Sequence, residues 1–159
     1  MKVFISHQME DAPLAIRIAT RLRDNHKVES YLDVMDDGAK DGHQLAMHLR
    51  EKMRGCSHLL AVVSGSTQRS WWVPWEIGVA SERDLPLATF SEGGASLPTY
   101  LQKWPYLSRA EHLDSYVAAA QQAGLTAILE SRGVHKEEAV VKRHSTDLFY
   151  EDLRRRLGQ

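Results

Sequence analysis

A glutamate follows three tryptophans in the stretch Ser70-Trp71-Trp72-Val73-Pro74-Trp75-Glu76. The pattern predicts a helix over residues 72–83, which would place Glu76 in its first turns, where the helix dipole favours an ionised carboxylate. Such a carboxylate in a partly apolar, aromatic pocket can stabilise the positive charge that develops on a sugar ring during glycosidic cleavage. If the leaving group is already a cation, no acid has to protonate it, so one carboxylate can suffice. Cleavage of a glycosidic bond is therefore one function that fits this stretch.

The same stretch has a simpler interpretation. A glutamate in the first turns of a helix often does no more than stabilise the helix dipole, and tryptophans there are often core residues. Trp71 and Trp75 are four residues apart and share a helix face, which is typical of packing. Trp72 shares a face with Glu76 by the same spacing, so Trp72 is the better candidate to line a pocket beside it.

Alternating strand and helix patterns would have to position this carboxylate. Apolar runs typical of buried strands occupy residues 2–6, 28–32, 58–64, 85–90 and, briefly, 106–107. Helical spacing of apolar residues marks the segments around 15–22, 45–53, 72–83, 110–123 and 145–157. The alternation predicts an α/β fold, a parallel sheet with helices on both faces. Asp11 is expected to cap the first helix.

Two strand ends carry the polar residues that could meet Glu76. Parallel α/β sheets bind ligands at the carboxyl ends of their strands, where the strand order reverses. In a five-stranded order 2-1-3-4-5, this crevice lies between the first and third strands, which end at Ser6-His7 and at Ser64. We expect these residues, together with Phe4, to contact a substrate there. A histidine after a strand is also typical of a surface loop.

The motifs, taken in order, resemble those of Toll/interleukin-receptor (TIR) domains over roughly the first 125 residues. The matching segments are Val3-Phe4-Ile5-Ser6-His7, Tyr31-Leu32-Asp33 with Asp36-Asp37-Gly38, and Val62-Val63-Ser64. Ser70, Trp72 and Glu76 resemble the serine-x-tryptophan-x-x-x-glutamate pattern of TIR domains that consume NAD. The resemblance implies a flavodoxin-like TIR fold with the strand order 2-1-3-4-5, and it assigns the essential catalytic glutamate to Glu76.

The activity that this resemblance implies is release of nicotinamide from NAD and production of an ADP-ribose-derived signal. NAD would be the substrate, with no separate cofactor and no metal. Phe4, Ser6, His7, Asp36, Ser64 and Trp72 are the expected substrate-binding residues. Asp36 and its neighbours also fit a solvated turn. Similar standalone bacterial proteins belong to Thoeris antiphage defence, where the product acts on a separate effector protein.

Two alternatives stay open at this point. Many TIR domains are non-enzymatic scaffolds that associate through the loop after the second strand, and related hydrolases cleave other nucleotide N-glycosidic bonds. The chain departs from the common pattern where Asp37-Gly38 replaces Pro-Gly and where Val73 replaces a cysteine. The first departure bears on self-association through that loop, whereas valine also occurs at the second position in enzymatic members.

Composition limits the other functions. A length of 159 residues predicts one domain. The resemblance implies a TIR domain over 1–132, with a C-terminal helical extension over 133–159 packed on the same domain. Residues 126–159 would serve either as a dimerising extension or as a lid. A net charge of -1 does not fit a nucleic-acid binder. No apolar run is long enough to cross a membrane, and the polar start does not resemble a signal peptide. A single cysteine cannot form an internal disulfide, so we expect a cytoplasmic protein.

Overall fold

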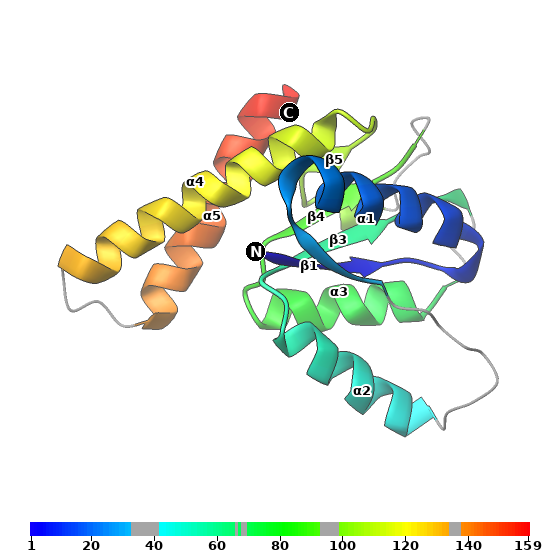
Figure 1. The fold of residues 1–159 in the computed structure, drawn as a ribbon. Helices are drawn as coiled ribbons and strands as arrows, with labels where there is room; N and C mark the ends of the chain where they lie inside the picture. The colour runs from blue at the N-terminus through cyan, green and yellow to red at the C-terminus, as the bar shows by residue number, and fades with distance from the viewer. Residues whose placement is uncertain (33–41, 66, 68–69, 93–98, 134–137) are drawn as a thin grey trace.

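A five-stranded parallel sheet forms the centre of the molecule (Figure 1). The computed structural model describes residues 1–32, 42–65, 67, 70–92, 99–133 and 138–159. The strands are β1 (Lys2–Ser6), β2 (Glu29–Leu32), β3 (His58–Val62), β4 (Leu87–Phe90) and β5 (Tyr106–Leu107). Their order is β2-β1-β3-β4-β5, with every neighbouring pair parallel. The predicted fold class and strand order are therefore confirmed.

Helices cover both faces of this sheet. The helices are α1 (Ala12–His26), α2 (Gly42–Arg54), α3 (Trp72–Glu82), α4 (His112–Gly133) and α5 (Glu138–Leu157), with a short 3-10 turn, η3, over Thr99–Leu101. Alternate residues of β1 face opposite sides, because Val3 and Ile5 pack with α1, α4 and α5, whereas Phe4 packs with α2 and α3. Burial on both faces explains why the central strands are continuous apolar runs. In the described part of the chain, no helix combines the length and apolar character that crossing a membrane requires.

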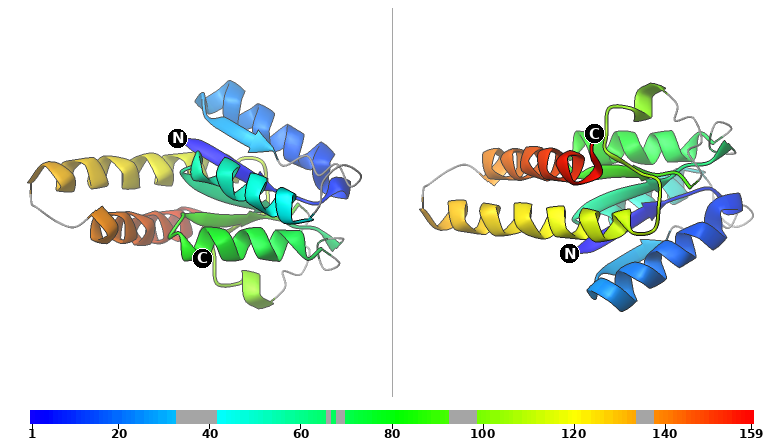
Figure 2. Two further views of the ribbon diagram at one scale, coloured as in Figure 1. Left: turned by 90° about the horizontal axis from the view of Figure 1, so that it is seen from below. Right: turned by 90° about the horizontal axis from the view of Figure 1, so that it is seen from above.

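The last two helices are longer than the sequence pattern predicted. The helix expected over 110–123 continues to Gly133, and the one expected over 145–157 begins at Glu138. Beyond residue 123, α4 extends past the sheet, and Leu125, Ile128 and Leu129 are exposed. The apolar residues there do not follow the spacing of a helix that packs one face on a core, so the sequence pattern did not mark this part as helical. Both views in Figure 2 show α4 and α5 running side by side past the sheet.

The α5 helix also contributes to the main core. Phe149 and Leu153 are completely buried in the same apolar cluster as Val3 and Ile5. The expected division between a domain over 1–132 and an extension over 133–159 stays a prediction.

His58, at the start of β3, lies between aromatic rings of α4 and α5. Its ring centroid is 6.1 Å from that of Tyr116 and 5.4 Å from that of Phe149, both in edge-on geometry. Burial, and secondarily the positive charge of the chain's N-terminus, lowers the pKa of His58 from 6.5 to about 4. The imidazole is therefore neutral in the folded protein at neutral pH.

This neutral histidine predicts a loss of stability in mild acid. As pH falls below 6.5, the unfolded chain binds a proton at His58 that the folded chain takes up only near pH 4. Between pH 7 and pH 5 this difference removes about 2 kcal/mol from the free energy of unfolding. His58→Phe keeps the ring contacts, so its urea-unfolding free energy is expected to fall by about 2 kcal/mol less over that range. Equal losses in both proteins would contradict the prediction.

Candidate active site

The start of α3 is fixed by the residues that precede it. The Ser70 side-chain oxygen accepts a hydrogen bond from the Val73 backbone N–H at 3.3 Å, and the Trp75 N–H donates to the Trp71 carbonyl at 3.3 Å. Pro74 falls in the first turn, where a helix needs no N–H from it. The helix therefore begins at Trp72, and Glu76 lies in its second turn.

Glu76 points into the protein beside the end of β1. Its side chain is 1% exposed, and its Oε2 accepts a hydrogen bond from the hydroxyl of Ser6, which is completely buried. Ser6 lies opposite Ala61 of β3, at the point where the strand order reverses. The strand topology thus brings together two residues that are seventy positions apart. A hydrogen bond to a buried carboxylate offsets part of the cost of removing it from water.

His7 follows Ser6 and is also buried, with 6% of its surface exposed. Its Nδ1 lies 3.2 Å from the Ile5 carbonyl oxygen, a contact in which Nδ1–H is the donor. In the neutral ring this tautomer leaves Nε2 as a hydrogen-bond acceptor. The interpretation of His7 as a surface-loop residue is therefore wrong. Its side chain is held by the hydrogen bond to the Ile5 carbonyl, at the end of β1.

Ser64 connects the end of the third strand to the turn after the first. Its hydroxyl donates to Asp11 Oδ2 at 2.9 Å, and its backbone N–H donates to the Thr67 hydroxyl at 2.9 Å. Asp11 is the last residue of a short 3-10 helix, η1 (Met9–Asp11), and is buried. Asp11 occupies the N-cap position of α1, as expected, but its side chain makes no capping hydrogen bond to that helix. The residue pattern gave no signal for the Asp11–Ser64 contact.

The three tryptophans form one ring cluster with Trp72 at its centre. Trp72 stacks on Trp71 with centroids 4.1 Å apart and meets Trp75 edge-on at 5.5 Å. Trp72 and Trp75 also pack against the core beside α2 and α3, whereas Trp71 is 65% exposed. The expected packing of Trp71 with Trp75 is thus replaced by contacts of each with Trp72. A substrate contact by Trp72 stays a prediction.

Of the other two expected substrate-binding residues, the structure describes Phe4 but not Asp36. Phe4 is completely buried, and its ring centroid lies 5.3 Å from that of Tyr31, so it occupies a core position. Asp36, with Asp37 and Gly38, lies outside the described residues. The structure therefore brings Glu76 together with Ser6, and His7 and Ser64 lie at the adjoining strand ends.

The chain has recognisable similarities to known proteins. The family model described as "TIR domain" matches residues 3–123. A probable 3' cyclic ADP-D-ribose synthase, ThsB', of Bacillus cereus (strain MSX-D12) is 28% identical over 123 residues. That match covers 71% of this chain and 63% of the relative, so it spans less than two thirds of that protein.

A similarity to solved structures is more distant. The TIR domains in the structure of the activated Roq1 resistosome, which recognises the pathogen effector XopQ, are 14% identical. The TM-score is 0.46, over 96% of this chain and 82% of that chain. The family match includes Ser6, Ser64 and Glu76 and leaves α5 outside.

Proposed function

We propose, because this chain belongs to the TIR domain family, that it is an enzyme that breaks the nicotinamide–ribose bond of NAD. Glu76 would be its catalytic carboxylate. The observation that carries this proposal is the buried Glu76 carboxylate beside Ser6, where the strand order of the sheet reverses. The similarity to a protein named as a probable cyclic ADP-D-ribose synthase supports NAD as the substrate.

The chemistry follows from the charges involved. The bond from the ribose anomeric carbon to the cationic nicotinamide nitrogen breaks, and its electron pair leaves with neutral nicotinamide. The positive charge that remains on the sugar ring is stabilised by the Glu76 carboxylate. Ser6 would hold that carboxylate in place by donating a hydrogen bond to it. In its neutral form, His7 could accept a hydrogen bond from a ribose hydroxyl through Nε2.

The second half of the reaction fixes the product. Water as the acceptor would bond to the anomeric carbon, lose a proton and give ADP-ribose. A nucleophilic atom of the same ADP-ribosyl group would instead close a ring and give a cyclic ADP-ribose isomer. We favour the cyclic product, because the Bacillus relative is named for that activity.

The product mass tests this proposal. NAD is incubated with the full chain at high protein concentration, because family members often have to self-associate, and the products are separated by mass spectrometry. We expect nicotinamide and a product lighter than ADP-ribose by one water. ADP-ribose alone would overturn cyclisation but leave NAD cleavage intact. Absence of nicotinamide at every protein concentration would overturn the enzyme and favour a scaffold.

The biological setting is part of the same proposal. We place the reaction in the bacterial cytoplasm, within antiphage defence, where the product would act on a separate effector protein. The resemblance to TIR proteins of Thoeris systems supports this setting. Self-association through the loop after β2 is also part of the proposal. That loop, residues 33–41, lies outside the described residues.

A further inference from the structure

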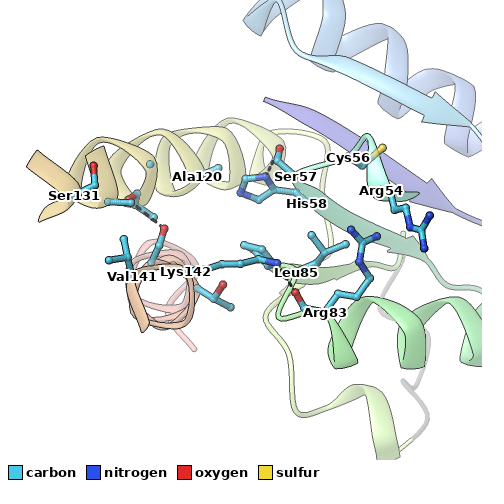
Figure 3. Close-up of a pocket in the computed structure, with 16 residues that line it drawn as sticks. Arg54, Cys56, Ser57, His58, Arg83, Leu85, Ala120, Ser131, Val141 and Lys142 are labelled. Atoms are coloured by element: carbon cyan, nitrogen blue, oxygen red, sulfur yellow. Dashed lines mark hydrogen bonds between the residues drawn. The ribbon is translucent and has the colours of Figure 1, made fainter. Parts of the chain in front are cut away.

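A pocket of about 630 Å³ lies at the opposite end of the sheet strands from Glu76. It opens between the sheet and the α4–α5 pair, with His58 and Leu85 on its sheet side (Figure 3). These residues lie at the amino ends of β3 and β4, whereas Ser6 lies at the carboxyl end of β1. Because the strands are parallel, the pocket lies at their amino ends and Glu76 lies at their carboxyl ends.

Three cationic side chains line this pocket, and no carboxylate is among its described lining residues. Arg54 is the last residue of α2, Arg83 follows α3, and Lys142 comes from α5. Neither arginine forms an ion pair with a carboxylate in the described part of the chain. Lys142 is held across the pocket because its Nζ donates to the Arg83 carbonyl at 2.6 Å. Among the described residues, the positive charge of this pocket is therefore not compensated by a carboxylate in its lining.

The Arg83 guanidinium is the most specific sign of a ligand. Its Nη1 is buried and has no hydrogen-bond partner among the described residues. Figure 3 shows this guanidinium directed from the end of α3 toward the part of β3 that carries His58. A buried donor without an acceptor is unfavourable, more so when it carries charge, and a bound oxyanion would remove that penalty. Planar guanidinium groups match the oxygen geometry of phosphates.

The remaining walls are suited to an organic group. Leu85, Pro86, Ala120 and Ala123 provide apolar surface, and a Cβ atom added at Gly124 would meet nothing within 4 Å. A volume of this size is typical of small-molecule sites. We propose that the pocket binds a small organic phosphate. Its phosphate oxygens would contact Arg83, Arg54 and Lys142, and its apolar part would lie against α4.

Two probes separate the parts of this proposal. ADP and inorganic pyrophosphate are titrated into the full chain by calorimetry at moderate salt, and ADP is expected to bind more tightly because it also fills the apolar part. Arg83→Met should weaken both probes by roughly tenfold or more, since it removes a charged hydrogen-bond donor. Gly124→Leu, which fills the apolar part, should weaken ADP by a similar factor and leave pyrophosphate unchanged.

Arg143→Met is the matched control. Arg143 is next to Lys142 on α5 and is likewise exposed, but it pairs with Asp84 at 3.6 Å and is not among the described residues that line this pocket. It should leave both affinities unchanged. Should Gly124→Leu fail to fold, Ala127→Leu on the same helix blocks the pocket instead. ADP affinity that survives both the Arg83 and the blocking variants would overturn the proposal, as would equal weakening by Arg143→Met. The readout is binding, so it is independent of whether Glu76 cleaves NAD.

Discussion

Replacement of Glu76 by glutamine is expected to lower the rate of nicotinamide release from NAD by roughly a hundred- to a thousandfold. Glutamine has nearly the same shape, and its amide oxygen can still accept the hydrogen bond from Ser6. The change therefore removes the negative charge while it keeps the packing of a side chain that is 1% exposed. The rate falls because the sugar cation loses its counter-charge at a buried position, where water screens charges poorly.

Glu82→Gln provides the control for this substitution. Glu82 is the last residue of the same helix and is exposed to solvent, so its replacement should leave the rate unchanged. Both variants are compared with the unmodified chain by initial rates of nicotinamide release, and circular dichroism checks that they are folded. Equal rates for Glu76→Gln and the unmodified chain would remove Glu76 from the mechanism.

Ser6→Ala is expected to reduce kcat by roughly tenfold or more and to change KM little. In the proposed mechanism Ser6 is a positioning residue, because its hydroxyl donates a hydrogen bond to Glu76. Removing a donor from a buried carboxylate disfavours the charged form of that carboxylate. The acidic limb of the pH–rate profile is therefore expected to move to higher pH. A loss of packing alone would not move that limb.

Ser57→Ala is the matched control for Ser6→Ala. The Ser57 hydroxyl also donates a hydrogen bond to a neighbouring element, to the Lys2 carbonyl of β1 at 3.1 Å, but Ser57 lies just before the amino end of β3. It should leave both kcat and the pH–rate profile unchanged. An unshifted acidic limb in Ser6→Ala, or the same decrease in Ser57→Ala, would show that Ser6 does not act through Glu76.

The sheet and the central contact of the site could be predicted because each depends on a strong local pattern. The first and fifth strands were expected over residues 2–6 and 106–107, where the structure has β1 and β5. Strands that are buried on both faces are uninterrupted apolar runs, so they are easily recognised. Once the strand order was assumed, Ser6 and Glu76 had to meet, because parallel strands bring their carboxyl ends to one edge.

The parts that could not be predicted depend on contacts between distant residues or on the absence of a core. The hydrogen bond from Ser64 to Asp11 joins residues 53 positions apart, and nothing in either neighbourhood indicates it. The second half of α4 has no sheet to cover, so its exposed Leu125 and Leu129 do not follow the usual amphipathic spacing. Trp72 became the centre of the tryptophan cluster because adjacent indoles can stack without sharing a helix face.

The nearly complete burial of Glu76 has a consequence for when the protein would act. A dinucleotide cannot reach a carboxylate that is 1% exposed unless neighbouring groups first move aside. For the proposed enzyme, the described conformation would therefore be an inactive one, and the fraction of molecules that open would limit the rate of turnover. A cell would then contain the folded protein without losing NAD to it, until an event that favours the open conformation activates the enzyme.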